Sequence, residues 1–320
     1  MAKIWVYAEI GSEGPDKTAL EILTKARTLE GDLEAVALGP GATEAAKVLG
    51  EHGAKTVYAS DDPVYGEFIA QPSAHALHQL VQEHQPNLLL GGFDYDTRDV
   101  FSRLAVKTGA TLMSNAVDVL GPDKAQTAIF GGSQIVDVTL SGPDPKLVLI
   151  RPKSFEAEPG GGGEANVVPV NVDISDDLKK AKRVEQIEEK QAGPKLEEAP
   201  IIVSGGRGLQ QPENFKLLEE LAEAIGNCAV GATRAVVDAG WVPYAMQIGQ
   251  TGKTVKPKVY MAIGISGATQ HIVGMKSSDR IIAVNKDAEA PIFQISDLGI
   301  IGDALKIVPQ ITQEVKARKG

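Results

Sequence analysis

The chain has little cysteine and little histidine. Its 320 residues include one cysteine and five histidines. The single cysteine, Cys228, excludes an internal disulfide, and such sparing use of cysteine is typical of a reducing compartment. The histidines stand without neighbouring cysteines or acidic clusters. We therefore predict no metal site.

Targeting and membrane patterns are also missing. No apolar run approaches the roughly 18 residues of a membrane-spanning helix. Residues 1–10 lack a charged region followed by a long apolar stretch, so we expect no signal peptide and a cytoplasmic location. The formal net charge of −10 disfavours nonspecific binding to nucleic acid. We therefore expect neither direct membrane insertion nor a nucleic-acid partner.

What the sequence does contain points to two globular domains. Hydrophobic residues make up 43% of the chain and charged residues 23%, and its length suits two domains. The net charge is −12 over residues 1–198 and +2 over residues 199–320. Residues 176–193 are strongly charged and predict a solvated connecting helix or linker. We expect one domain at residues 1–193 and a second at residues 194–320.

The first half alternates strand-like and helix-like patterns. This alternation predicts a parallel sheet with helices on both faces. Thr43 is a plausible early cap of its helix. The expected strands are residues 4–8, 33–38, 56–59 and 87–90, and the expected helices are residues 18–29, 41–50, 73–83 and 98–109.

The pattern changes after residue 110. Four further strands are expected, at residues 127–130, 134–140, 146–150 and 167–172, with little helix between them. The glycine run at residues 159–163 predicts a loop. We expect these strands to extend the sheet in an antiparallel manner or to form a small flanking sheet.

The second half returns to the alternation. We expect strands at residues 201–204, 227–230, 259–265, 280–284 and 291–295, with helices at residues 213–225 and 301–315. Small or polar residues follow each strand, at 204–208, 231–234, 266–271, 285–287 and 296–299. Because ligands bind beyond the carboxyl ends of parallel strands, these five loops predict a nucleotide-sized cleft.

The residue types in these loops suit an anionic ligand. Glycines let the backbone approach a diphosphate closely, and Arg207 and Arg234 offer fixed positive charge. Residues 249–254 end like a phosphate-binding P-loop, but Gln247 stands where that motif needs glycine, which argues against an NTPase. No arrangement of nucleophile and base is visible, so no catalytic residue is predicted.

The second half strongly resembles the alpha subunit of electron transfer flavoprotein. The resemblance covers essentially all of it, while the first half matches in length and pattern with weaker signatures. It implies an α/β fold of two Rossmann-like parallel-sheet domains, with the C-terminal domain binding FAD. The motifs that carry it lie at residues 203–209, 231–240, 247–253, 264–271, 285–287, 289–293 and 299–303.

The resemblance implies a role for each residue beside the flavin ring. Thr233 and Arg234 would lie at the isoalloxazine, with Arg234 over the ring. Gln250 and Thr251 would approach its edge, with the Thr251 hydroxyl toward N5. His271 would reach the pyrimidine edge near O2, protonated or as a hydrogen-bonding partner. Arg234, Thr251 and His271 would thus tune the redox potential. Thr233 replaces a serine common in the family but keeps the hydroxyl.

The rest of FAD would lie along the other loops. The resemblance implies that Arg207 contacts the diphosphate and that residues 266–270 wrap the ribityl chain and diphosphate. Asn285 and Asp303 would bind the adenosine end. The further cofactor-binding positions implied are Gly208, Ile248, Gly249, Ser266, Gly267, Ala268, Thr269, Gln270 and Ala304.

The resemblance also implies partners. The chain would pair with a beta subunit and accept electrons from flavin dehydrogenases, such as the acyl-CoA dehydrogenases of fatty acid beta-oxidation. It would pass them to a membrane-bound electron transfer flavoprotein–quinone oxidoreductase. In the first half, the loop at residues 91–99 would be a vestigial nucleotide site that is empty and serves the partner interface.

Two alternatives remain open. One is an electron-bifurcating form with a second FAD in the beta subunit, which depends largely on that subunit's residues. The other is a structural module that binds FAD or another nucleotide without carrying electrons. Arg234 and His271 argue against the second, because a structural site needs no charge at the pyrimidine edge.

Overall fold

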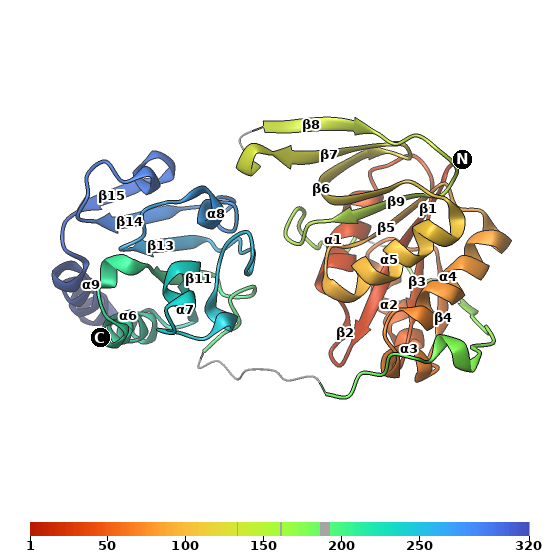
Figure 1. Cartoon of the computed structure of the whole chain (residues 1–320), viewed down its shortest axis with the longest axis horizontal. Coiled ribbons are helices and arrows are strands. Elements are labelled where there is room, and N and C mark those ends of the chain that lie inside the picture. The colour runs from red at the N-terminus through yellow and green to blue at the C-terminus, as the bar shows by residue number, and fades with distance from the viewer. Residues whose placement is uncertain (133, 161, 186–192, 320) are drawn as a thin grey trace. The chain divides into compact units, whose positions relative to one another are not determined.

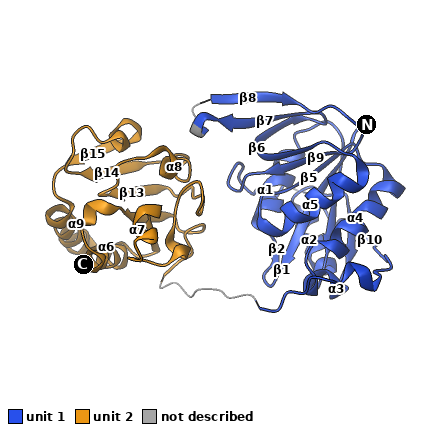
Figure 2. Ribbon diagram, in the orientation of Figure 1, with its two compact units in different colours: residues 1–186 blue, residues 187–320 orange. Residues whose placement is uncertain are grey.

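The computed structural model describes residues 1–132, 134–160, 162–185 and 193–319. The chain divides into two compact units, Met1–Gln186 and Ile187–Gly320 (Figure 2). The predicted domain boundary between residues 193 and 194 adjoins residues 186–192, which lie outside the described residues. Of the charged segment at 176–193, the structure describes a short 3₁₀ helix at Asp176–Leu178. No helix in the described ranges combines the length and apolar character needed to cross a bilayer.

Unit 1 is built on a ten-stranded sheet in the order β10-β4-β3-β1-β5-β9-β6-β7-β8, with β2 paired to β1 (Figure 1). The strands are β1 (Lys3–Gly11), β2 (Gly14–Pro15), β3 (Asp32–Leu38), β4 (Thr56–Ser60), β5 (Leu88–Gly92), β6 (Leu112–Gly121), β7 (Lys124–Ile129), β8 (Gln134–Thr139), β9 (Lys146–Ile150) and β10 (Asn166–Pro169). The helices are α1 (Lys17–Ala26), α2 (Ala42–Glu51), α3 (Val64–Glu67), α4 (Gln71–His84) and α5 (Tyr95–Thr108).

Helices cover both faces of the parallel part of this sheet, as the alternation predicts. Successive side chains of a strand point to opposite faces. Ile4 and Val6 of β1 pack in a core cluster with α1 and α2, whereas Trp5 and Tyr7 pack in a second cluster with α4 and α5. A strand buried on both faces therefore reads as a continuous apolar run.

The strands after residue 110 differ from expectation. Strand β9 joins the sheet parallel to β5 and β6, and β10 pairs parallel with β4, so the antiparallel prediction was wrong for both. All five residues of β9 are buried, which places it inside the sheet rather than at a flank. Of the strands expected after residue 110, β7 and β8 do extend the sheet in an antiparallel manner.

Strand β6 was not predicted at all. Polar residues interrupt its apolar pattern, and Asn115 has a φ of 60°. The pairing register of β6 shifts against both β7 and β9. Such bulges break the period of two on which strand prediction depends. The cap of α2 also differs: Gly41 is the N-cap residue, and Thr43 donates its backbone N–H to the Asp61 carboxylate at 3.0 Å.

Unit 2 has a five-stranded sheet, parallel throughout, in the order β12-β11-β13-β14-β15. The strands are β11 (Ile201–Gly205), β12 (Cys228–Ala232), β13 (Val259–Ile263), β14 (Ile281–Asn285) and β15 (Leu298–Ile301). The helices are α6 (Lys216–Ile225), α7 (Arg234–Asp238), α8 (Thr269–Ile272) and α9 (Ala304–Lys319). Because the chain proceeds from β11 to β12 on one side and to β13 on the other, a crevice is expected at the carboxyl ends of β11 and β13.

One predicted strand of unit 2 is a helix instead. Residues Pro291–Ile295 form a 3₁₀ helix, and the fifth strand is β15 at Leu298–Ile301. Proline suits the first turn of a helix, and Ile292 of this turn is packed in the core. The predicted fifth loop, at 296–299, is therefore wrong. Its Asp297 accepts the backbone N–H of Ile281 at 2.8 Å, at the amino end of β14.

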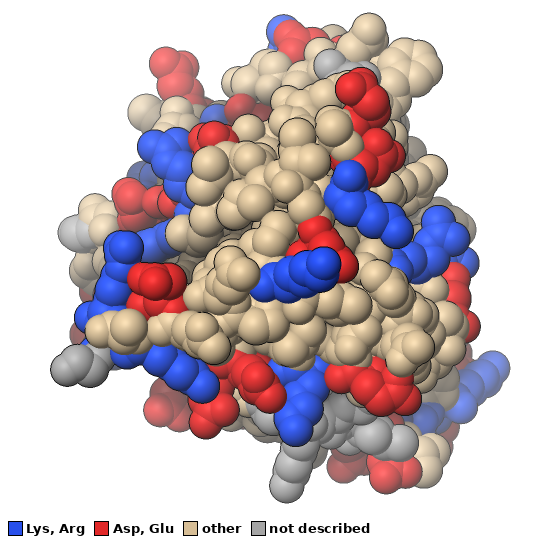
Figure 3. Space-filling model, turned by 90° about the vertical axis from the view of Figure 1, so that its left-hand side faces the viewer, with Lys and Arg blue, Asp and Glu red and all other residues tan. Residues whose placement is uncertain are grey.

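Charges of both signs are mixed on the face of the molecule in Figure 3. Lysines, arginines, aspartates and glutamates lie interspersed around a broad uncharged area. This mixing agrees with the small net charge of residues 199–320. No single-sign patch dominates that face.

Candidate functional site

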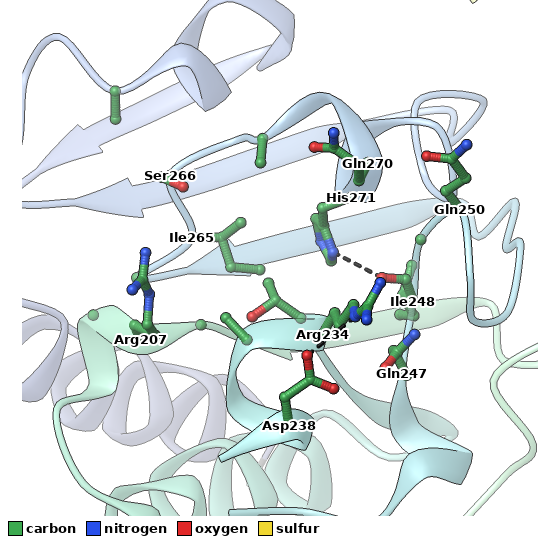
Figure 4. Close-up of a pocket in the computed structure, with 18 of the residues that line it drawn as sticks. Arg207, Arg234, Asp238, Gln247, Ile248, Gln250, Ile265, Ser266, Gln270 and His271 are labelled. Atoms are coloured by element: carbon green, nitrogen blue, oxygen red, sulfur yellow. Dashed lines mark hydrogen bonds and ion pairs between the residues drawn. The ribbon is translucent and has the colours of Figure 1, made fainter. Parts of the chain in front are cut away.

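A pocket of about 610 Å³ opens at the carboxyl edge of the unit 2 sheet (Figure 4). Its volume lies within the roughly 300–1,000 Å³ of ligand-binding pockets. The loops that follow β11, β12, β13 and β14 all contribute to it, and the segment at 247–251 closes one side. The pocket thus lies at the crevice that the strand order predicts.

The floor of the pocket is made of backbone in close contact. The N–H of Gly208 donates to the Gly264 carbonyl at 2.9 Å. A Cβ atom at Gly208 would lie 2.6 Å from the Cα of Gly264, and Gly264 itself has a φ of +64°. A Cβ at Gly206 would lie 2.6 Å from the Gly264 carbonyl oxygen. Only glycines allow these two loops to meet, and they leave room for a ligand above the backbone.

Another glycine lets the segment at 247–251, which forms the side wall of the pocket, approach α8 closely. Gly249 has a φ of +140°, and a Cβ there would lie 2.6 Å from the carbonyl oxygen of Gln270. The next residue, Gln250, donates its backbone N–H to that same oxygen at 2.7 Å. The 247–251 segment is thereby held against the start of α8.

Arg234 supplies positive charge to the pocket. It begins α7 immediately after Thr233, and its Nε donates to the Asp238 carboxylate at 3.1 Å, one helical turn away. Both side chains are about two-thirds exposed, at 65% and 60%. An exposed pair of this kind contributes little to stability, so Arg234 can turn toward an anionic or electron-rich ligand at small cost. Figure 4 shows its guanidinium directed toward Ile248.

His271 is buried and neutral. It is 5% exposed, its Nδ1 donates to the Ile248 carbonyl at 2.9 Å, and the Tyr260 hydroxyl donates to its Nε2 at 2.9 Å. Burial lowers the pKa of His271 to about 4. Of the two states expected for His271, this arrangement favours the hydrogen-bonding neutral ring, because desolvation disfavours the charged ring. In this arrangement both ring nitrogens are used within the protein.

Most of the predicted cofactor residues meet in this one pocket. Four of the predicted positions do not line it. A Cβ at Gly267 would lie 2.4 Å from the backbone nitrogen of Ile292, so Gly267 lets its loop pass under the 3₁₀ helix. Thr269, Asp303 and Ala304 lie at the starts of α8 and α9. The predicted residues that do line it are Arg207, Gly208, Thr233, Arg234, Ile248, Gly249, Gln250, Thr251, Ser266, Ala268, Gln270, His271 and Asn285.

Several lining residues were missed. Asp238 lies four residues after Arg234, a helical spacing that could have identified it as a partner. Gln247 lies inside a family motif but was considered only as an argument against a P-loop. The other missed residues are Gly206, Ala235, Gly264, Ile265, Asp287 and Ala290.

The residues of this pocket suit FAD. The glycines of its floor let a flat group approach the backbone closely. The positive charge of Arg207 suits a diphosphate, and that of Arg234 suits an electron-rich ring. Side-chain hydroxyls and amides at the rim, among them Thr233, Thr251 and Gln270, can bind polar ring and ribityl atoms.

The corresponding edge of the unit 1 sheet is acidic. Glu9 lies near the end of β1, and Asp94 and Asp96 follow β5. Asp94 accepts the backbone N–H of Thr97 at 2.7 Å, and the Thr97 hydroxyl donates to Glu9 at 3.4 Å. Burial, with the nearby Asp94 carboxylate, raises the pKa of Glu9 to about 8. These carboxyl groups disfavour a phosphate at the loop that resembles a nucleotide site.

Replacing Glu9 by glutamine is expected to change how stability depends on pH. Because the pKa of Glu9 rises from 4.5 unfolded to about 8 folded, its stabilising contribution is complete below pH 4.5 and lost as pH rises through 8. Glu9→Gln should therefore be more stable than wild type at pH 8, with a Tm higher by several degrees, and should have an unchanged Tm near pH 4. Thermal unfolding of the full chain at both pH values tests this. A difference between variant and wild type that is the same at both would contradict it.

Two family models match the chain. One, described as the electron transfer flavoprotein domain, covers residues 4–175, and the other, the electron transfer flavoprotein FAD-binding domain, covers residues 195–276.

Curated proteins match over the whole length. The electron transfer flavoprotein subunit alpha of Mycobacterium leprae is 39% identical, with 100% of each chain covered. That of Clostridium acetobutylicum is 38% identical, covering 98% of this chain and 97% of its own. Protein FixB of Clostridium saccharobutylicum is 37% identical, and the match covers 98% of this chain and 96% of that protein. Among solved structures, a calicheamicin glycosyltransferase covers 99% of this chain and 94% of its own at 11% identity, with a TM-score of 0.28 that carries no argument.

Proposed function

This chain belongs to the electron transfer flavoprotein alpha-subunit family, and from that premise we propose how its pocket serves an FAD-based electron carrier. Membership confirms the resemblance read from the motifs. The chain is a carrier with FAD as its cofactor, not an enzyme that converts a substrate, and it pairs with a beta subunit. FAD, when bound, accepts and releases the electrons.

The observation that supports the proposed site best is that most of the predicted residues line one pocket at the β11–β13 crevice. We assign Arg207 to the diphosphate, and Arg234 with Thr233 to the isoalloxazine. Thr251 donates its hydroxyl at the N5 edge, and its neighbour Gln250 contacts the same edge. Residues 266–270 bind the ribityl chain and diphosphate, and Asn285 with Asp303 binds the adenosine end.

These residues act by binding, orientation and electrostatics. The positive charge of Arg234 favours the negative charge that the ring gains with the first electron. The neutral His271 supplies no such charge, but it fixes the Ile248 carbonyl and with it the side wall of the pocket. The redox tuning at the pyrimidine edge therefore falls mainly to Arg234.

We further propose that flavin dehydrogenases such as acyl-CoA dehydrogenases are the donors. A membrane-bound electron transfer flavoprotein–quinone oxidoreductase would be the acceptor. The reduced, buried Cys228 is in keeping with a cytoplasmic site of action.

The donor assignment is tested with the heterodimer, an acyl-CoA dehydrogenase and its acyl-CoA substrate. The flavin absorbance of the heterodimer should bleach within the turnover time of the dehydrogenase. Bleaching by dithionite but not by this couple would contradict the donor, while leaving the cofactor assignment intact.

A further inference from the structure

A buried glutamine lies directly behind the pocket threonine. Gln247 is 2% exposed, although it lines the pocket. Its side-chain Nε2 donates to the Thr251 hydroxyl oxygen at 3.0 Å. Figure 4 shows Gln247 beneath Ile248, at the base of the side wall.

The segment at 247–253, which contains this contact, forms a tight turn held by backbone hydrogen bonds. The N–H of Lys253 donates to the Gln247 carbonyl at 2.7 Å, and the N–H of Gly249 donates to the Lys253 carbonyl at 3.1 Å. A Cβ at Gly252 would lie 2.4 Å from the carbonyl oxygen of Gln247 and 2.9 Å from the Cγ of the Gln247 side chain. The Gln247 side chain is therefore packed tightly under the turn.

Thr251 is held through its main chain as well. The Tyr244 hydroxyl donates to the Thr251 carbonyl at 2.5 Å. Because both its carbonyl and its hydroxyl oxygen accept hydrogen bonds from within the protein, Thr251 has a fixed place on the rim.

The direction of the Gln247 hydrogen bond decides what Thr251 can offer. A hydroxyl has one proton and two lone pairs. Because Gln247 donates, it occupies a lone pair and leaves the Thr251 proton free to point elsewhere. Thr251 is exposed to the pocket, so that proton is available to a ligand there.

We infer that Gln247 is a positioning residue: it fixes the Thr251 hydroxyl so that this group donates to the flavin edge and does not rotate away. The inference rests on the proposed function, in which Thr251 contacts FAD. In this role Gln247 acts through Thr251.

A double-mutant cycle on the purified heterodimer tests this, with the one-electron midpoint potential of the bound flavin as the readout. Thr251→Val should lower the equilibrium constant for adding the first electron to the flavin about tenfold, which lowers the one-electron midpoint potential by about 59 mV. Gln247→Leu should lower it about threefold, because the hydroxyl is then free to rotate. The double variant should match Thr251→Val alone, since Gln247 has nothing left to orient. If Gln247→Leu does not hold FAD, Gln247→Met, which better preserves side-chain length, takes its place in the cycle.

The possible outcomes distinguish failure of the Gln247 positioning role from failure of the proposed FAD site. No shift in Thr251→Val would show that the proposed site is wrong. A shift in Thr251→Val with none in the Gln247 variant would overturn the positioning role alone. A Gln247 effect that persists undiminished in the Thr251→Val background would overturn it too, because Gln247 would then act directly or by deforming the pocket.

Discussion

Replacing Gly264 by alanine is expected to weaken FAD binding by about 30-fold or more. Gly264 has a φ of +64°, and the new Cβ would lie 2.8 Å from the Cα of Gly208. Forcing an extra methyl into such a contact costs about 1–3 kcal/mol, and relief requires the two loops of the pocket floor to part. A loss of 2 kcal/mol corresponds to about 30-fold in affinity. Flavin fluorescence during dilution of the heterodimer measures the dissociation constant.

Gly240→Ala is the matched control for this variant. Gly240 has a similar φ of +71°, but no heavy atom lies within 4 Å of the added Cβ. It carries the same backbone strain without the collision, so its FAD affinity should stay close to wild type. Equal affinities for the two variants would show that the backbone contact of Gly208 and Gly264 does not form the cofactor's floor.

Arg234→Ala is expected to lower the one-electron potential of the flavin by roughly 40–90 mV. Two unit charges at ~4 Å and an effective dielectric of ~20 interact by ~4 kcal/mol. Solvent screening of an exposed arginine reduces this to about 1–2 kcal/mol. At 59 mV per tenfold, that energy gives the stated shift. Spectroelectrochemical titration of the heterodimer measures it.

Three variants control for the charge. Arg234→Lys keeps the charge and should retain most of the potential. Asp238→Asn removes the competing carboxylate and should raise the potential slightly. Arg280→Ala removes an equally exposed arginine at the amino edge, where it pairs with Asp297, and should change nothing. If Arg280→Ala lowers the potential as much as Arg234→Ala, the effect comes from net charge and not from the pocket.

Much of the fold could be predicted because strand and helix periods are local properties. The apolar runs of β1, β3, β13 and β14 and the amphipathic pattern of α6 follow directly from spacing. Strand β6 could not be predicted, because its register shifts interrupt the alternation. The 3₁₀ helix at Pro291–Ile295 was mistaken for a strand because short apolar runs suit either structure, and packing decided between them.

The candidate site, like the fold, could be predicted from the sequence only in part. Glycine-rich strand ends and arginines are visible in the sequence, so the lining residues were largely predicted. The sequence left open whether His271 is protonated or a neutral hydrogen-bonding partner, because its state depends on burial against Tyr260 and Ile248, which are distant in sequence. The role of Gln247 depends on the direction of one hydrogen bond, which the sequence does not contain.

The FAD content of the heterodimer formed by this chain and its beta subunit tests the central claim most directly. Absorbance of the flavin released from wild type and from Gly264→Ala gives the number of FAD molecules per heterodimer. We predict one FAD bound by this chain, retained in wild type and depleted in the variant. A second FAD that survives the Gly264→Ala substitution would indicate the bifurcating form, with its extra flavin in the beta subunit. A folded wild-type heterodimer without flavin, or with the same flavin content in both proteins, would contradict the assignment of this pocket.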